Sequence, residues 1–190
     1  MTRDRRFSRL GSGAVAAFAA IALAGCVSGG SKKPAQNLPA ADAHADLVDA
    51  RGADRGRVDI FKDSSGLRLE LVARGFAAGT YGMHIHAVGR CDAPGFTTAG
   101  PHWNPTGAQH GRDNPMGAHH GDLPNLVVEN DMIGRATLRL VGSRLEGEGG
   151  VLDSDGAAFV IHAGPDDMRT DPSGNSGNRI VCGVIALPQP

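Results

Sequence analysis

The feature that most restricts the fold of this chain is a two-residue alternation of apolar and polar side chains, which recurs from about residue 43 onward. In residues 67–71, Leu-Arg-Leu-Glu-Leu, every leucine falls on one face of an extended strand. Residues 134–140 alternate in the same way, and turn-forming residues precede both segments. No stretch combines a sustained helical period with capping residues. The pattern therefore predicts an all-β fold.

The alternation and its turn signals predict eight short strands, at about residues 43–50, 57–62, 67–73, 81–88, 124–129, 134–140, 157–162 and 179–186. Many short strands of this kind favour an antiparallel barrel or sandwich. Two long polar segments, residues 89–124 and 163–178, interrupt the strands. Loops of that length inside a compact domain are usually functional or disordered.

The first 25 residues have the pattern of an export signal. Four arginines precede an apolar run from about Ala14 to Ala24, which is shorter than the roughly 20 residues of a membrane-spanning helix. The run ends in Leu23-Ala24-Gly25-Cys26, which resembles a bacterial lipobox, where a peptidase cuts before the cysteine and the cysteine carries the lipid. An ordinary signal peptide with an incidental cysteine is the alternative.

Three parts of the chain are expected: a lipoprotein-type signal peptide (1–25), a lipidated Cys26 with a flexible Gly/Ser/Pro/Ala/Lys-rich tether (26–42), and one globular domain (43–190). We expect a periplasmic or cell-envelope location, with the lipid on Cys26 as the membrane attachment. Loss of residues 1–25 removes four basic residues and one acidic residue, which leaves an acidic chain. No basic stripe remains, so nucleic acid is not an expected partner.

Histidines are concentrated in one part of the sequence. Six of the eight lie between His84 and His120. His84 and His86 are two residues apart on an expected strand, so both imidazoles project from one face. The others occupy the first long segment and its end: His102, His110, His119 and His120, with Asp122 close by. Imidazole suits copper and zinc, aspartate suits zinc, and the set is large enough for two metals without any thiolate.

Five segments, in matching order and spacing across about residues 43–187, resemble the copper/zinc superoxide dismutases. They are Gly82–Cys91 (G-M-H-I-H-A-V-G-R-C), Gly100–Pro105 (G-P-H-W-N-P) with His110-Gly111, His119–Leu123 (H-H-G-D-L), Val160–Asp167 and Gly174–Ile185. The resemblance implies a Greek-key β-barrel with one copper and one zinc per chain. It also implies an enzyme that converts two superoxide anions and two protons to oxygen and hydrogen peroxide by Cu(II)/Cu(I) cycling.

The resemblance also implies a role for each matching residue. The implied copper ligands are His84, His86, His102 and His162. The implied zinc ligands are His102, His110, His119 and Asp122, so that His102 bridges the two metals as imidazolate and exchanges a proton during the cycle. The implied supporting residues are Asp166, which orients ligand imidazoles; Arg179, which attracts superoxide; and Cys91 and Cys182, which form a disulfide.

Two adjacent pairs leave a choice of residue. His119 and His120 alternate along an extended backbone, and the family spacing H-x-x-D favours His119 for zinc, with His120 solvated or hydrogen-bonded nearby. Asp166, four residues after His162, is preferred to Asp167. His44 lies outside every motif and is expected to be structural.

A different function is also open: a non-enzymatic, lipid-tethered protein that binds copper and zinc with the same histidines. Arg179 and the shared His102 favour the enzyme, because a storage protein needs neither. The 163–178 segment has three aspartates and, before Arg179, only Arg169 as a cation, so lysine-based steering is not expected. Family members pair through different faces, which leaves both a monomer and a homodimer open.

Overall fold

The computed structural model of the chain describes residues 39–189. The expected signal peptide, Cys26 and most of the tether lie outside the described residues, so they stay predictions. Among residues 39–189 the only helix is a short 3-10 turn, η1 (Thr97–Ala99), and all strand pairings are antiparallel. That part of the chain contains no helix of the length and hydropathy needed to cross a membrane. The predicted all-β class is confirmed.

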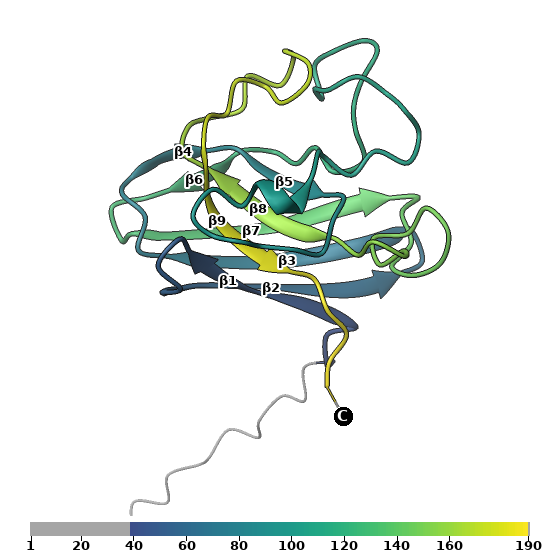
Figure 1. The fold of residues 1–190 in the computed structure, drawn as a ribbon, viewed down its shortest axis with the longest axis horizontal. Coiled ribbons are helices and arrows are strands. Elements are labelled where there is room, and N and C mark those ends of the chain that lie inside the picture. The colour runs from purple at the N-terminus through teal and green to yellow at the C-terminus, as the bar shows by residue number, and fades with distance from the viewer. Residues whose placement is uncertain (1–38, 190) are drawn as a thin grey trace, which may run out of the picture. The chain divides into compact units, whose positions relative to one another are not determined.

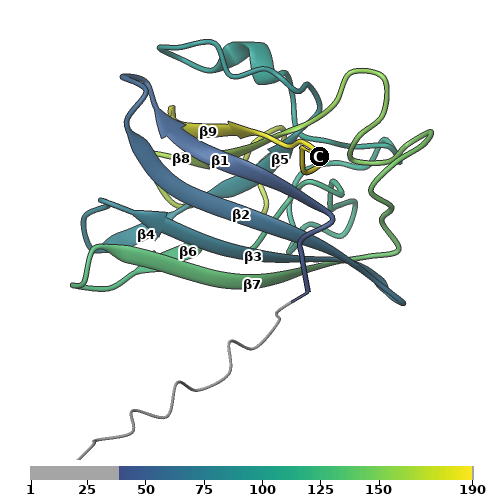
Figure 2. The ribbon, with the colours of Figure 1, turned by 90° about the horizontal axis from the view of Figure 1, so that it is seen from below.

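Nine strands form one sheet in the order β4-β6-β7-β3-β2-β1-β9-β8-β5. Their bounds are β1 (Ala43–Asp49), β2 (Asp54–Asp63), β3 (Gly66–Arg74), β4 (Gly79–Tyr81), β5 (Met83–His86), β6 (Leu126–Val128), β7 (Ile133–Val141), β8 (Ala158–His162) and β9 (Arg179–Val184). The sheet curls round on itself, with β1, β2, β3 and β7 on one side and β9, β8 and β5 on the other (Figures 1 and 2).

The barrel closes at Gly82, and this point corrects the predicted strand 81–88. β4 and β5 stand at opposite ends of the sheet order, yet only Gly82 separates them in the sequence. The chain therefore pairs with β6 before Gly82 and with β8 after it. A Cβ at Gly82 would lie 2.8 Å from the Ser176 Cβ, so only glycine fits this close approach. The single strand predicted for residues 81–88 is therefore two strands, β4 and β5, and β5 ends at His86.

The core follows the alternation seen in the sequence. Leu67, Leu69 and Leu71 of β3 are buried, and Leu69 lies opposite Leu138 on β7. Each leucine buried in this way contributes about 1.5–3 kcal/mol relative to an exposed side chain. The core thereby fixes the register of the long strands β2, β3 and β7.

β5 is buried on both faces, because the two long loops cover the face that points away from the core. Met83 and Ile85 pack in the core, while His84 and His86 alternate to the opposite face. The loops between β5 and β6 and between β8 and β9 lie on the same side of the barrel (Figure 1). The disulfide implied by the family resemblance is confirmed: Cys91 in the first loop is bonded to Cys182 in β9.

Candidate metal centre

Four histidines from three segments of the chain converge beside β5. His84 and His86 come from β5, and His162 ends the neighbouring strand β8. His102 belongs to the first long loop, which returns to β5 and pairs His102 with His86. One ring nitrogen from each of the four lies within 4.8 Å of the others. These are the four residues predicted to hold copper.

The nitrogens that face one another in this group have no protein partner. Within residues 39–189, six buried side-chain nitrogens lack a hydrogen bond, and four of them belong to this group: His84 Nδ1, His86 Nε2, His102 Nε2 and His162 Nε2. The second nitrogen of each ring is held by a nearby oxygen, at 2.6 Å from Asp166, 2.8 Å from Gly100, 2.8 Å from Asp122 and 3.0 Å from Gly177, respectively. Unpaired buried polar atoms are costly, so this arrangement fits a cation that all four would share.

The second group is centred on the Asp122 carboxylate. Its Oδ1 lies 2.8, 3.0 and 3.1 Å from the Nδ1 atoms of His102, His110 and His119. Its Oδ2 accepts backbone N–H bonds from Gly111 and His119 at 2.9 and 3.0 Å. Three imidazoles and one carboxylate gathered in this way form a donor set typical of zinc. They are the predicted zinc residues.

His84 also lies near the second group, since ligand atoms of His84, His102, His110 and Asp122 are within 4.8 Å of one another. However, His84 Nε2 is occupied by Asp166 at 2.6 Å, and its Nδ1 faces the first group. His119 Nδ1 is 3.1 Å from Asp122 Oδ1 and 3.4 Å from His102 Nδ1. We therefore regard His119, not His84, as the fourth member of the zinc set.

Asp166 connects the two groups through their outer nitrogens. Its Oδ2 accepts from His84 Nε2 at 2.6 Å and its Oδ1 from His110 Nε2 at 3.1 Å. A Cβ at Gly174, where φ is +62°, would lie 1.8 Å from Asp166 Oδ1, so a side chain there would displace the carboxylate. Asp167, the alternative, is exposed and accepts bonds from its own loop.

The two histidines left out of the metal sets lie apart from these nitrogens. The His120 ring packs edge-on against Trp103, with centroids 5.4 Å apart, and its Nδ1 is 3.4 Å from Ser143 Oγ. His44 is on β1, where its backbone pairs with Ala186. The preference for His119 over His120 therefore agrees with where the two rings lie.

Protonation differs between the two groups when no metal is bound. Burial lowers the pKa of His84 to about 3, of His86 to about 2 and of His162 to about 4. In the second group, burial opposes the charge, but hydrogen bonds to Asp122 and Asp166 raise the pKa of His110 to about 9. At pH 7 the copper-side rings are therefore neutral, and their unprotonated nitrogens have free lone pairs. On the zinc side, Asp122 and Asp166 stabilise the positively charged form of His110.

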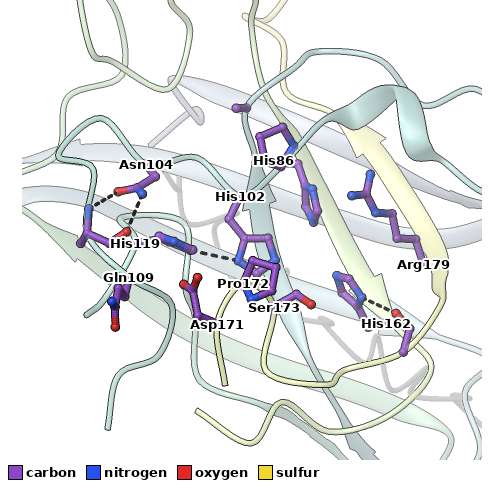
Figure 3. A pocket seen from close by; sticks show the side chains of 14 residues that line it. His86, His102, Asn104, Gln109, His119, His162, Asp171, Pro172, Ser173 and Arg179 are labelled. Carbon is purple, nitrogen blue, oxygen red and sulfur yellow. Dashed lines mark hydrogen bonds between the residues drawn. The ribbon is translucent and has the colours of Figure 1, made fainter. Parts of the chain in front are cut away.

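Arg179 faces the same cavity as the copper-side histidines. The cavity has a volume of about 650 Å³, and His86, His102, His162 and Arg179 all line it (Figure 3). The guanidinium donates to the carbonyls of Phe96 and Gly100 at 2.8 and 2.7 Å. Burial lowers the pKa of Arg179, but an arginine stays charged in proteins.

Some residues that shape the centre were not predicted from the sequence. The Gly100 carbonyl accepts from both His86 Nδ1 and Arg179, so it links one of the clustered rings to the guanidinium. Asn125 clamps the backbone of Asp166 from both sides, at 2.8 Å each. These contacts join segments far apart in the chain and leave no local pattern.

Known proteins resemble this chain in both sequence and structure. The sequence model of the family described as copper/zinc superoxide dismutase matches residues 54–185. Superoxide dismutase [Cu-Zn] 2 of Aquifex aeolicus is 38% identical over 148 residues, which covers 75% of this chain and 85% of that protein. The superoxide dismutase-like protein YojM of Bacillus subtilis is 39% identical over 182 residues, or 87% of this chain and 91% of the relative.

Solved structures give the same result. A crystal structure of a SOD-like protein from Bacillus subtilis matches with a TM-score of 0.71 and 41% identity, covering 74% of this chain and 96% of that one. The clock protein EA4 matches at a TM-score of 0.65 and 27% identity, covering 80% and 98%. The matched segment, these relatives and the shared barrel lead to one conclusion: the chain belongs to the copper/zinc superoxide dismutase family.

Proposed function

We propose that this protein is a superoxide dismutase with one copper and one zinc per chain, which converts two superoxide anions and two protons to oxygen and hydrogen peroxide. The observation that carries the proposal is the shared ring of His102. Its Nε2 is open toward His84, His86 and His162, and its Nδ1 points at Asp122. One imidazole thus belongs to two donor sets of different chemistry.

The donor sets match the proposed metals. Four neutral imidazoles suit copper, and three imidazoles with one carboxylate suit zinc. Copper, when bound, supplies the one-electron couple that the reaction requires. His84, His86, His102 and His162 would hold copper through their unpartnered nitrogens, and His102, His110, His119 and Asp122 would hold zinc.

The chain's own residues account for the handling of substrate and protons. Arg179 is a fixed cation with planar donors, so it attracts a small anion and aligns it beside the copper-side rings. His102 carries a proton at Nε2 when that nitrogen is free, and it delivers the proton to the reduced oxygen species. Asp122 keeps the other nitrogen of His102 in place, so the ring returns to the same position.

A second reading, a lipid-tethered protein that binds copper and zinc without catalysis, uses the same histidines. Names within the family, such as superoxide dismutase-like and clock protein, include some that do not state this activity. The reading does not account for Arg179, which faces the cavity and is held by two backbone carbonyls. A binding protein has no need for a positioned anion-binding group.

Metal analysis combined with a dismutation assay on the purified protein tests the proposal. We expect one copper and one zinc per chain and rapid disproportionation of superoxide. Stoichiometric metal with no activity above that of free buffer would support the binding protein instead. Zinc alone, with no copper bound, would contradict both readings.

We also propose that the protein is exported to the periplasm or cell envelope and anchored through lipid on Cys26. The lipobox-like Leu23-Ala24-Gly25-Cys26 supports this proposal. Labelling with a fatty acid should mark the wild type and leave Cys26→Ser unlabelled. Equal labelling of both would refute lipidation at Cys26, and sedimentation of the same preparations would show whether the domain is a monomer or a homodimer.

A further inference from the structure

Asp171, in the loop between β8 and β9, contacts the zinc side of the centre without belonging to either donor set. Its Oδ1 accepts a hydrogen bond from the backbone N–H of His110 at 2.6 Å. The ring of His110 is already held at both nitrogens by Asp122 and Asp166. The bond from Asp171 adds a point of attachment on the backbone N–H of the same residue.

This bond is part of a seam between the two long loops. The Asp113 N–H donates to the Met168 carbonyl at 3.0 Å, and Asn114 Nδ2 lies 3.4 Å from the Arg169 carbonyl. Asp113 is exposed, whereas Asn114 is half-buried and its Nδ2 also donates to the His110 carbonyl at 2.9 Å. The contact from Asp171 holds His110, whose side chain is fully buried. The seam therefore acts on a metal-side residue at its N–H, through Asp171, and at its carbonyl, through Asn114.

The Asp171 carboxylate lines the same cavity as Arg179, but from the other side. Figure 3 shows Asp171 near His102 and His119, with Arg179 beyond His86 and His162. The cavity thus has a negative wall on the zinc side and a positive wall on the copper side. A small anion in it is repelled by the first and attracted by the second, so the field has a direction along the cavity.

We propose that Asp171 is a positioning residue that fixes the backbone of His110 and, by its charge, directs small anions away from the zinc side toward Arg179. The inference rests on the proposed function for the identity of its anion, superoxide. Two substitutions distinguish the positioning role from the steering role. Asp171→Asn keeps an acceptor oxygen and removes the charge, whereas Asp171→Ala removes both.

Zinc retention tests the positioning part. Copper-free protein loaded with zinc alone is titrated with a competing chelator. Outer residues that orient a metal ligand typically change metal affinity by about 10- to 100-fold. We expect Asp171→Ala to bind zinc about tenfold more weakly and Asp171→Asn to stay within about twofold of the wild type. Equal losses in both variants, or none in either, would overturn this part.

Anion affinity tests the steering part. The probe is azide, titrated against the copper- and zinc-loaded protein by visible absorption. We expect Asp171→Asn to bind azide about threefold more tightly at low ionic strength, and the gain to disappear at high salt because added ions screen the charge. Asp113→Asn is the matched control, since it makes the same change in net charge beside a different cavity.

An unchanged azide affinity in Asp171→Asn, or an equal gain in Asp113→Asn, would overturn the steering part. Neither titration depends on turnover. If the wild type binds both metals but fails to dismutate superoxide, the proposed function fails while both titrations still decide the role of Asp171. The rise in kcat/KM expected for Asp171→Asn, about threefold at low salt, then applies only to an active enzyme.

Discussion

The copper half and the zinc half of the centre are adjacent, yet the protein treats their histidines in opposite ways. On the copper side, each ring is fixed by an oxygen on one nitrogen and left unpaired on the other. On the zinc side, the nitrogens of His110 are both occupied by carboxylates. Under the proposed function, neutral ligands with one unpaired nitrogen each suit a metal that gains and loses an electron. A carboxylate-rich site suits a metal whose charge stays constant.

Removal of a copper-side ring should have the largest effect. We expect His162→Ala to abolish dismutation, because one of four ligands is lost, while most of the zinc stays bound, because His162 contributes nothing to the Asp122 group. Metal analysis and an activity assay measure both. His120→Ala, which changes a neighbouring histidine outside both sets, should keep metals and activity. Loss of zinc with retained copper in His162→Ala would reverse the assignment of the two halves.

Removal of the zinc-side carboxylate should affect the other half. Asp122 has contacts with three rings and two backbone N–H groups, so Asp122→Ala should weaken zinc binding by about 100-fold or more. Competition with a chelator measures this loss. Copper should still bind through the three rings that do not depend on Asp122. Zinc affinity within about threefold of the wild type would show that Asp122 is not a ligand.

Reversal of the Arg179 charge should slow the reaction and leave both copper and zinc bound. Arg179→Glu places a negative charge in the cavity, and we expect kcat/KM to fall by about 100-fold, with a smaller fall for Arg179→Lys. Both metals should remain bound at wild-type levels. An unchanged rate would assign Arg179 a structural role, as a donor to the Phe96 and Gly100 carbonyls.

Acid should destabilise the metal-free protein mainly through the copper half. The pKa values of His84, His86 and His162 are lowered in the folded state, so the unfolded chain binds more protons below pH 6.5. Stability is therefore lost as the pH falls from 6.5 toward 4, by on the order of 3 kcal/mol for each histidine. His110, with a raised pKa of about 9, binds its proton in the folded state and loses its contribution as the pH rises through 9.

Urea unfolding of the metal-free protein between pH 4 and pH 9 measures this profile. His86→Gln, which cannot be protonated, should flatten the acid limb of the curve. A stability that rises as the pH falls would contradict the protonation states given for the copper half. The metal-loaded protein should resist acid better, because bound metal competes with the proton for the same nitrogens.

Much of the fold follows from local sequence patterns. The alternating leucines of residues 67–71 predict β3 and its buried face, and six of the strands are within one or two residues of the predicted bounds at both ends: β1, β3, β6, β7, β8 and β9. The break at Gly82 was not predicted, because it depends on Ser176 packing against it from a distant loop. Local patterns identify strands, but they do not show where a strand changes partners.

The sequence motifs predict which residues form the centre, but they do not predict the contacts around those residues. The spacing of His119 and Asp122 distinguishes His119 from His120, in agreement with where the rings lie. In contrast, the shared Gly100 carbonyl and the Asn125 clamp arise only after the loops pack. Ligand assignments remain predictions until a metal is measured in them, whereas the disulfide and the barrel are already confirmed.

The central claim is that one imidazole, His102, serves both halves. A crystal structure of the oxidised, copper- and zinc-loaded protein, with anomalous diffraction at both metal edges, tests it most directly. We predict copper on His102 Nε2 together with His84, His86 and His162, and zinc on His102 Nδ1 together with His110, His119 and Asp122. Two metals with no common ligand, or zinc held by His120, would contradict the account.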